Sequence, residues 1–272
     1  MDYLFDKWNK LKKTLINKQV FIFLDYDGTL TPIVDYPDKA VISAEARNLL
    51  KGLSALPKYQ VGIISGRALS DIKKMVSLEN ITYVGNHGLE IEGSRIKLES
   101  QVSPRLKAII RQIHEDMVSR LSAIKGVLIE DKGPTISIHY RLIDKKDMIL
   151  LRNIFTEITR PFIVRHKIKI DSGKKVFEIK PDITWDKGKV ILWLLAKQQF
   201  AVGNKEIIPI CMGDDVTDED AFRALKNRGI TVFVGRPKAS QAEYYLRDTK
   251  EVVKFLNQIL KLPESAGICQ NR

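Results

Sequence analysis

The stretch VFIFLDYDGTL, residues 20–30, decides the fold. Its first five residues are all apolar and rich in β-branched and aromatic side chains, which is typical of a strand buried on both faces of a parallel sheet. The run ends abruptly at two acidic residues, Asp25 and Asp27, and Gly28 permits a sharp turn. The stretch therefore predicts a buried strand with carboxylates at its carboxyl end.

Patterns typical of strands and of helices alternate in the parts of the chain around this stretch. Further apolar runs predict strands at residues 61–64, 81–84, 207–212 and 230–234. Helical spacing of apolar residues predicts helices at 4–16, 43–56, 69–76, 187–199, 218–226 and 249–260. Strands that alternate with helices indicate an α/β fold with a doubly wound, mainly parallel sheet.

The alternation of single strands and helices is interrupted between residues 103 and 182. Here the pattern predicts helices at 104–121 and 145–159, and strands at 127–132, 135–141, 162–170 and 175–179. Such an order is typical of an antiparallel sheet with helices on one side. We therefore expect a catalytic core of residues 1–102 and 183–272, with an α+β cap domain inserted at 103–182.

Composition narrows the classes of function. The 272 residues are 44% hydrophobic and 29% charged, with a net charge of +12 that suggests either an anionic partner or a solvated basic surface. No basic face with interleaved aromatic residues indicates a nucleic-acid partner. Two cysteines cannot form a disulfide framework, and no apolar run has the length of a signal peptide or a membrane span, so we expect a cytoplasmic protein without a membrane partner.

Three polar clusters follow predicted strands, where the ligands of open parallel sheets collect. They are Asp25 with Asp27, the sequence SGR at 65–67, and GDDVTD at 213–218. Crowded carboxylates repel each other unless a cation neutralises them, and an all-oxygen site suits Mg²⁺. Lys187, at a predicted helix start, can neutralise phosphate. Each feature alone is more often a turn, a helix cap or a solvated side chain; their combination indicates phosphate chemistry.

These motifs resemble those of the haloacid-dehalogenase superfamily of phosphotransferases, and the resemblance covers the whole chain. It rests on residues 25–30, Ser65, Lys187 and 213–215. More narrowly, the sequence is similar to the trehalose-6-phosphate phosphatase family in the stretches LDYDGTLTPIV (24–34), IISGR (63–67), GNHGLE (85–90), IEDKGPTISIHYR (129–141), VFEIKP (176–181) and GDDVTDEDAF (213–222). The first and last stretches occur widely in the superfamily, whereas the others narrow the choice.

The resemblance implies a Mg²⁺-dependent phosphatase that forms trehalose in the last step of its biosynthesis. Asp25 is then the nucleophile that forms an aspartyl-phosphate, and Asp27 is the general acid and base. Ser65 and Lys187 balance the phosphoryl charge. The implied Mg²⁺ ligands are the Asp25 carboxylate, the Asp27 backbone carbonyl and Asp214, and the resemblance places Asp215 and Asp218 behind them. Arg67 belongs either to this supporting set, paired with an acid of the core, or to the residues that contact the ligand.

Strand alternation gives a separate interpretation of the cap. Glu130 and Lys132 share one face of their strand, His139 and Arg141 share a face of the next, and Glu178 and Lys180 share a face of the last. From the pattern alone, a solvent-facing surface is as good an interpretation as a binding surface. The resemblance favours sugar binding by four cap residues: Glu130, Lys132, Arg141 and Glu178. Asn86 and His87 lie in a core loop with glycines on both sides and are further candidates for contact with the sugar; a buried structural role is the alternative for His87.

Other functions remain open at this stage. Another sugar-phosphate phosphatase of the same superfamily, of the sucrose- or mannosylglycerate-phosphate type, is the nearest alternative. A phosphosugar sensor without activity is less consistent with an intact nucleophile and acid. The substrate class implied is a small sugar phosphate, with a functional link to a trehalose-6-phosphate synthase. The predicted cap holds 17 Lys and Arg against 10 Asp and Glu, a net charge of +7 that suits an anionic substrate.

Overall fold

The computed structural model describes residues 1–34, 36–93, 96–100, 102–173, 175–203, 206–237 and 239–263. The chain divides into two compact units, which we call the core unit (Met1–Glu99 and Trp185–Arg272) and the cap unit (Ser100–Thr184). The sequence pattern placed the corresponding boundaries at 103 and 182. The role of the cap unit in sugar recognition remains a prediction.

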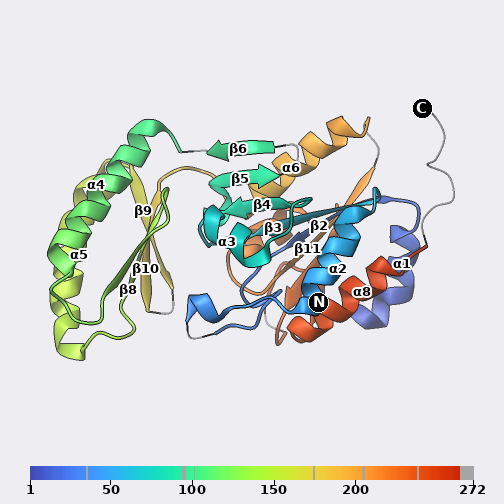
Figure 1. Ribbon diagram of the computed structural model, residues 1–272, viewed down its shortest axis with the longest axis horizontal. Coiled ribbons are helices and arrows are strands. Elements are labelled where there is room, and N and C mark those ends of the chain that lie inside the picture. Colours follow the sequence, from blue (N-terminus) through green and yellow to red (C-terminus); the bar gives the residue numbers. More distant parts are fainter. Residues whose placement is uncertain are drawn as a thin grey trace. The chain divides into compact units, whose positions relative to one another are not determined.

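The core unit contains a mainly parallel sheet (Figure 1). Its strand order is β1-β13-β12-β11-β2-β3-β4-β5-β6, and β4 and β5 pair antiparallel. The central strands are β2 (Gln19–Leu24), β3 (Tyr59–Ile64), β4 (Thr82–Gly85), β11 (Ile207–Gly213) and β12 (Ile230–Val234). The predicted α/β fold class is therefore confirmed.

The edges of this sheet are strands that the sequence pattern did not indicate. They are β1 (Asp2–Tyr3), β13 (Tyr244–Leu246), β5 (Glu90–Gly93) and β6 (Ile96–Ser100). Each is short, and edge strands lack the continuous apolar run that identifies a strand buried on both faces. β1 pairs with β13 in parallel, so the first residues of the chain complete this edge of the sheet.

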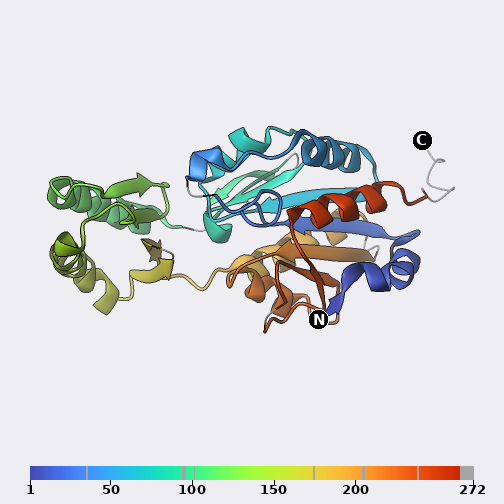
Figure 2. The same ribbon diagram turned by 90° about the horizontal axis from the view of Figure 1, so that it is seen from below.

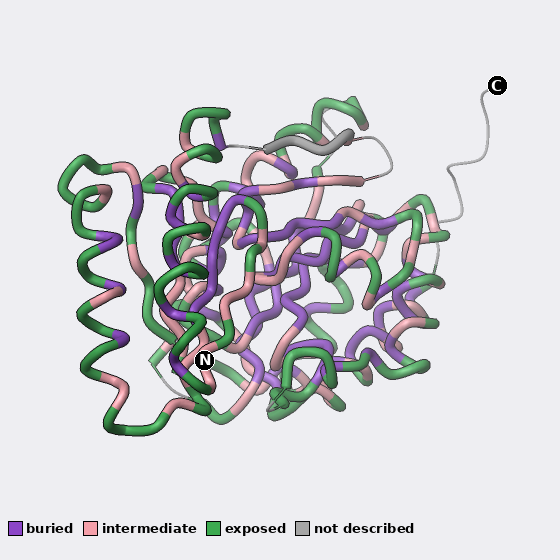
Figure 3. The backbone as a smooth tube through the Cα atoms, turned by 60° about the vertical axis from the view of Figure 1, so that its left-hand side comes forward, coloured by how far each residue is buried: buried purple, intermediate pink, exposed green. Residues whose placement is uncertain are grey.

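Helices cover both faces of the core sheet (Figure 2). One apolar cluster joins the sheet to α1 (Trp8–Leu15), α2 (Ala44–Ala55), α3 (Leu69–Val76) and α8 (Thr249–Leu260). A second cluster joins the opposite face to α6 (Lys187–Ala201) and α7 (Asp218–Ala224). Buried positions therefore concentrate along the central strands (Figure 3). Short 3₁₀ turns lie at Leu4–Lys7, Pro37–Lys39 and Asn86–Gly88, and the first of these replaces the start of the helix predicted at 4–16.

The cap unit is a four-stranded sheet with two helices packed on one face (Figure 1). The strands β7 (Leu128–Asp131), β8 (Ile136–His139), β10 (Val176–Pro181) and β9 (Ile168–Gly173) lie in that order and pair antiparallel. The helices are α4 (Pro104–Leu121) and α5 (Met148–Val164), the latter preceded by a 3₁₀ turn at Lys145–Asp147.

One predicted boundary in the cap unit was wrong. The pattern ended a helix at residue 159 and began a strand at 162, but α5 continues through Pro161 to Val164 and β9 begins at Ile168. Buried residues on the face of α5, among them Phe155 and Ile158, hold the helix against the sheet, and Pro161 lies in its last turn. Proline costs one helical hydrogen bond there without ending the helix at once.

Among the described residues, none of the helices has both the length and the apolar character that a membrane span requires.

Candidate active site

Asp25 lies directly after β2, at the carboxyl end of the core sheet. Its backbone N–H donates to the carbonyl of Met212 on β11 at 3.0 Å, which continues the pairing of the two strands by one residue. The carboxylate is nearly buried and accepts a 2.7 Å hydrogen bond from Nζ of Lys187. A strand end and a neighbouring strand thus fix the position of the predicted nucleophile.

Lys187 joins Asp25 to a second carboxylate. It is the first residue of α6, only 3% exposed, and its Nζ also donates to Oδ1 of Asp218 at 2.7 Å. The other oxygen of Asp218 accepts from the backbone N–H groups of Asp214 and Asp215, both at 3.1 Å. Because both oxygens of Asp218 are engaged by protein donors, this residue holds the lysine and the 214–215 loop in place.

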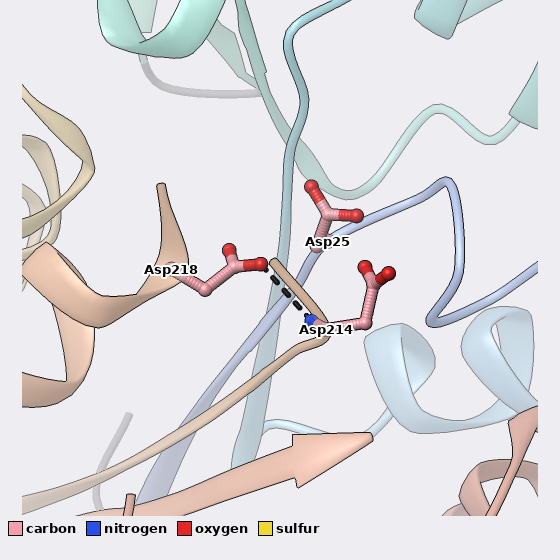
Figure 4. Close-up of side chains that lie close together, drawn as sticks. All are labelled: Asp25, Asp214 and Asp218. Carbon is pink, nitrogen blue, oxygen red and sulfur yellow. Dashed lines mark hydrogen bonds between the residues drawn. The ribbon is translucent and has the colours of Figure 1, made fainter. Parts of the chain in front are cut away.

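Three carboxylates gather at this point (Figure 4). Oxygens of Asp25, Asp214 and Asp218 all lie within 4.8 Å of one another. Gly28 allows this approach, because a Cβ at that position would lie 2.2 Å from Oδ2 of Asp214. Its φ of +92° is also a conformation that favours glycine. The turn after β2 can therefore pack closely against the loop after β11 because Gly28 has no side chain.

Burial and charge perturb the titration of this cluster. Burial raises the pKa of Asp25 well above its ordinary value; Lys187 opposes this effect, while Asp218 and Asp214 add to it. Burial acts against the charge of Lys187 too, but Asp218 and Asp25 outweigh it, so the pKa of Lys187 is raised. The cluster therefore places one ammonium among the carboxyl groups of three acidic residues. An oxygen-binding cation fits such a donor set.

Asp27 does not point its carboxylate at Lys187 in this structure. Both its oxygens accept from the guanidinium of Arg67, from Nε at 2.7 Å and from a terminal nitrogen at 2.6 Å. The sequence left open whether Arg67 contacts an acid of the core or the ligand, and the structure shows the acid. A bidentate pair of this kind fixes the plane of the carboxylate as well as its distance.

Ser65 follows β3 directly and is almost fully buried. Its backbone N–H donates to the carbonyl of Val84 at 2.9 Å, and its Oγ accepts from the N–H of Arg67 at 3.1 Å. The loop after β4 closes over it, because the N–H of His87 donates to the Ser65 carbonyl at 3.0 Å. A Cβ on Gly66 would meet the His87 ring at 2.5 Å, so this imidazole packs directly on the SGR turn.

Asn86 and His87 both have left-handed backbone conformations, with φ of 51° and 56°. Asn86 is fully buried, and its amide donates to Oε2 of Glu90 at 2.8 Å. This contact suits a residue that shapes the loop better than one that contacts a sugar. His87 is partly exposed and remains a candidate for substrate contact.

Asp215 is exposed, whereas Asp214 is half-buried and Asp218 is buried. Its Oδ1 accepts from the N–H and the hydroxyl of Thr217, both at 2.7 Å. Burial alone would raise the pKa of Asp215, but Lys187, the two bonds from Thr217 and the nearby His87 outweigh burial and lower it. The carboxylate is therefore held in its charged form at the edge of the cluster.

The cap residues form a separate cluster on one face of the cap sheet. The register places Glu130 opposite Ser137, and Ser137 opposite Glu178, so the polar faces predicted from alternation coincide. Nζ of Lys132 lies 3.8 Å from Glu130 Oε2 and 3.6 Å from Glu178 Oε1. His139 Nε2 lies 3.0 Å from Glu130 Oε2. The structure thus brings together three of the four predicted cap residues.

Arg141 is different from the other predicted cap residues. It follows β8 in a turn and is exposed, outside the paired strands. Lys180, which strand alternation had placed on the face of Glu178, contacts Glu178 and Asp171 at 3.0 and 2.9 Å. Sequence reasoning did not include Lys180 among the sugar-binding candidates, and it missed Asp171. Alternation along β10 puts Lys180 on the face of Glu178, but only the pairing of β9 with β10 reveals Asp171.

Comparison with known proteins gives a consistent result. The family model described as trehalose-phosphatase matches residues 23–250. The chain is 35% identical over 256 residues to a protein named probable trehalose-phosphate phosphatase D from Arabidopsis thaliana, a match that covers 90% of this chain and 68% of that protein. Another relative, a trehalose 6-phosphate phosphatase from Zea mays, is 33% identical over 258 residues, with 89% of this chain and 70% of that protein covered.

Solved structures show the same likeness. The C-terminal domain of trehalose-6-phosphate phosphatase from C. albicans superposes with a TM-score of 0.73 at 25% identity, over 94% of this chain and 97% of that chain. A structure described as a trehalose-6-phosphate phosphatase related protein gives a TM-score of 0.75 at 27% identity, over 89% of this chain and 97% of that chain.

Proposed function

The chain belongs to the trehalose-phosphatase family, and on this premise we propose that it hydrolyses trehalose 6-phosphate to trehalose and phosphate. The observation that carries the proposal is the buried contact of Lys187 with Asp25 and Asp218 at the carboxyl end of the sheet. It lies within the matched residues 23–250 and combines a nucleophile, a charge-balancing ammonium and a third acid in one place. Charged side chains are almost never fully buried unless they are paired, and Lys187 is buried here between two acidic residues.

In the proposed reaction, an oxygen of Asp25 attacks phosphorus while the bond between phosphorus and the sugar oxygen breaks. Asp27 gives a proton to the leaving sugar oxygen. It then takes a proton from the water that attacks the phosphorus of the aspartyl-phosphate, while the bond between phosphorus and the Asp25 oxygen breaks; phosphate leaves and the Asp25 carboxylate is restored. Lys187 and Ser65 stabilise the negative charge on the phosphoryl oxygens. Asp218 acts through Lys187, because it fixes the ammonium toward Asp25.

Both oxygens of the Asp27 carboxylate accept hydrogen bonds from the Arg67 guanidinium. We interpret this pair as the resting arrangement of the acid, and Asp27 gives up part of the contact when it transfers a proton. Arg67 stays beside Asp27 and limits the movement of its carboxylate.

The acidic cluster fits a divalent cation. The Asp25 and Asp214 carboxylates and the Asp27 carbonyl would hold it, whereas Asp218 has both oxygens committed to protein donors. The family implies Mg²⁺, and when bound it neutralises the carboxylates and the phosphoryl group. Gly28 lets the Asp214 carboxylate come close to the turn that carries Asp25 and Asp27.

We assign recognition of the sugar to the polar face of the cap sheet. Glu130 and Glu178 accept hydrogen bonds from hydroxyl groups, and Lys132 between them donates to hydroxyl oxygens. The three side chains are held by contacts to one another and to neighbouring strands. A pre-arranged set of acceptors and a donor suits a ligand with several hydroxyls better than a bare phosphate.

A substrate panel tests the proposal. The rates of phosphate release from trehalose 6-phosphate, sucrose 6-phosphate, mannosylglycerate phosphate and glucose 6-phosphate are compared in the presence of Mg²⁺. We expect kcat/KM for trehalose 6-phosphate to exceed the others by about 10²-fold or more, because several sugar hydroxyls are read at once. Equal values across the panel would favour a less selective sugar phosphatase, and no release from any substrate would favour a sensor.

A further inference from the structure

Lys180 is a buried lysine on the face of the cap sheet that carries the sugar-recognition residues. It lies on β10, two residues after Glu178, and only 7% of its surface is exposed. Its Nζ lies 3.0 Å from Oε2 of Glu178 and 2.9 Å from Oδ2 of Asp171. The ammonium is thus placed between two carboxylates from neighbouring strands.

The strand register explains why these three side chains meet. Glu178 on β10 is directly opposite Asp171 on β9, and Lys180 is directly opposite Lys169. Adjacent strands lie about 4.8 Å apart, so the two carboxylates are too close to share one face without a cation between them. Lys180 supplies this charge from the next position along the same face.

From this arrangement we propose that Lys180, together with Asp171, is a positioning residue that holds Glu178 in the orientation needed to bind a hydroxyl of the sugar. The inference rests on the proposed function, because it assigns Glu178 to the substrate. Lys180 itself does not contact the sugar: its ammonium is buried against two carboxylates.

The orientation of Glu178 is set from both sides. Oε2 faces Lys180, and Oε1 lies 3.6 Å from Nζ of Lys132. A glutamate has three rotatable side-chain bonds, and two cations at fixed positions restrict them. If Lys180 loses its charge, Glu178 and Asp171 repel each other, and Glu178 turns toward Lys132 or toward solvent. Either movement removes a prepared acceptor and weakens the binding of the sugar.

Lys169 is a matched control on the same face of the sheet. It occupies the position opposite Lys180 in the register, but it is exposed, and its Nζ donates to the carbonyl of Ile183 at a long 3.4 Å. The pair Lys180→Met and Lys169→Met therefore removes the same charge from neighbouring positions. Only the first change removes a contact with Glu178.

The experiment measures KM and kcat for trehalose 6-phosphate and, in parallel, for p-nitrophenyl phosphate, which has no sugar. For Lys180→Met we expect KM for trehalose 6-phosphate to rise about 10-fold, with kcat and the p-nitrophenyl phosphate reaction changed less than about 2-fold. Lys169→Met should match the wild type on both substrates. Lys180→Arg, which keeps a cation at the site, should recover a KM within about 3-fold of the wild type.

Asp171→Asn provides a second test at an exposed edge position, where a folding defect is not expected. It should raise KM for trehalose 6-phosphate by about 2- to 3-fold, in the same direction as Lys180→Met. Thermal unfolding of each variant shows whether the cap unit remains folded. A loss of activity on both substrates, with a lowered melting temperature and no rescue by Lys180→Arg, would show a merely structural lysine and overturn the inference.

The outcomes separate the inference from the proposed function. If the wild-type enzyme prefers trehalose 6-phosphate but Lys180→Met and Lys169→Met have the same KM, the inference alone is wrong. If the wild type shows no preference for trehalose 6-phosphate, the proposed function fails, and the assignment of Glu178 and Lys180 to its sugar fails with it.

Discussion

Replacing Gly28 with alanine tests how closely the two acidic loops of the core must approach. The added Cβ would lie 2.2 Å from Oδ2 and 2.6 Å from Oδ1 of Asp214. Non-bonded carbon and oxygen atoms require at least about 3.0 Å. The Asp214 carboxylate must therefore move by about 0.8 Å, or the turn that carries Asp25 and Asp27 must open by the same amount.

Two costs follow from this substitution. The φ of +92° at residue 28 costs an alanine about 1–2 kcal/mol, because its Cβ crowds the following carbonyl. A displacement close to 1 Å at a reacting centre lowers the rate by about 10²-fold. We therefore expect Gly28→Ala to lose about 1–2 kcal/mol in the free energy of unfolding and about 10²-fold in kcat/KM. Since Asp214 is an expected Mg²⁺ ligand, the Mg²⁺ concentration that gives half-maximal rate should also rise.

Gly203→Ala is the matched control for the backbone term. Gly203 has φ of +69°, and a Cβ there meets nothing within 4 Å in the part of the chain that the structure describes. The free energy of unfolding of Gly203→Ala should be about 1 kcal/mol lower than that of the wild type, with no change in kcat/KM. The assay combines urea unfolding with phosphate release from trehalose 6-phosphate over a range of Mg²⁺ concentrations. Gly28→Ala with a rate and a Mg²⁺ dependence equal to those of Gly203→Ala would refute the reasoning.

Three further predictions concern other contacts of the core unit. Arg67→Lys removes the bidentate contact with Asp27 (2.6 and 2.7 Å). In steady-state assays it should lower kcat about 10-fold, with a smaller effect on KM, and an unchanged kcat would contradict a role for the pair. Burial raises the pKa of the Cys211 thiol well above its ordinary value, so in a Cys269→Ser background this thiol should resist alkylation at pH 8 until the protein unfolds. The contribution of the thiol to stability should fall as the pH rises above about 8.5, because the unfolded chain then loses the proton. Rapid labelling of the native protein would contradict this prediction. Ser43→Ala removes the 3.1 Å cap bond to the N–H of Ala46 and should lower the unfolding free energy by about 1 kcal/mol in urea titrations, whereas Ser54→Ala, on the same helix near its end, should change it little.

The sequence predicted best those elements that are determined by local chemistry. The starts predicted for α2 and α4 lie within one residue of the observed ones, and the serines that precede these helices, Ser43 and Ser103, each accept a capping bond from the backbone. The apolar run at 20–24 identified β2 because a strand buried on both faces needs no polar residue. The helix that continues through Pro161 could not be predicted, since it depends on packing of α5 against a sheet formed by distant residues.

In the candidate site too, some contacts could be predicted from the local sequence and others depend on distant parts of the chain. The predicted order of strands and helices was enough to place Asp25, Asp214 and Lys187 together at the carboxyl end of the sheet, because parallel strands all end on that side. The partner of Arg67 depended on the path of the loop after β3, for which the sequence contains no periodic signal. Likewise, the contact of Lys180 with Asp171 depends on the register of β9 against β10, and a shift by one residue would put Asp171 on the opposite face.

Asp25→Asn tests the central claim most directly, namely that the Asp25–Lys187–Asp218 cluster performs phosphoryl transfer. The variant keeps the size of the side chain but removes the nucleophilic charge that faces Lys187. We predict that hydrolysis of trehalose 6-phosphate falls by at least about 10⁴-fold, while the thermal unfolding midpoint stays within a few degrees of the wild type. Hydrolysis above about a tenth of the wild-type rate in a folded Asp25→Asn protein would contradict the account.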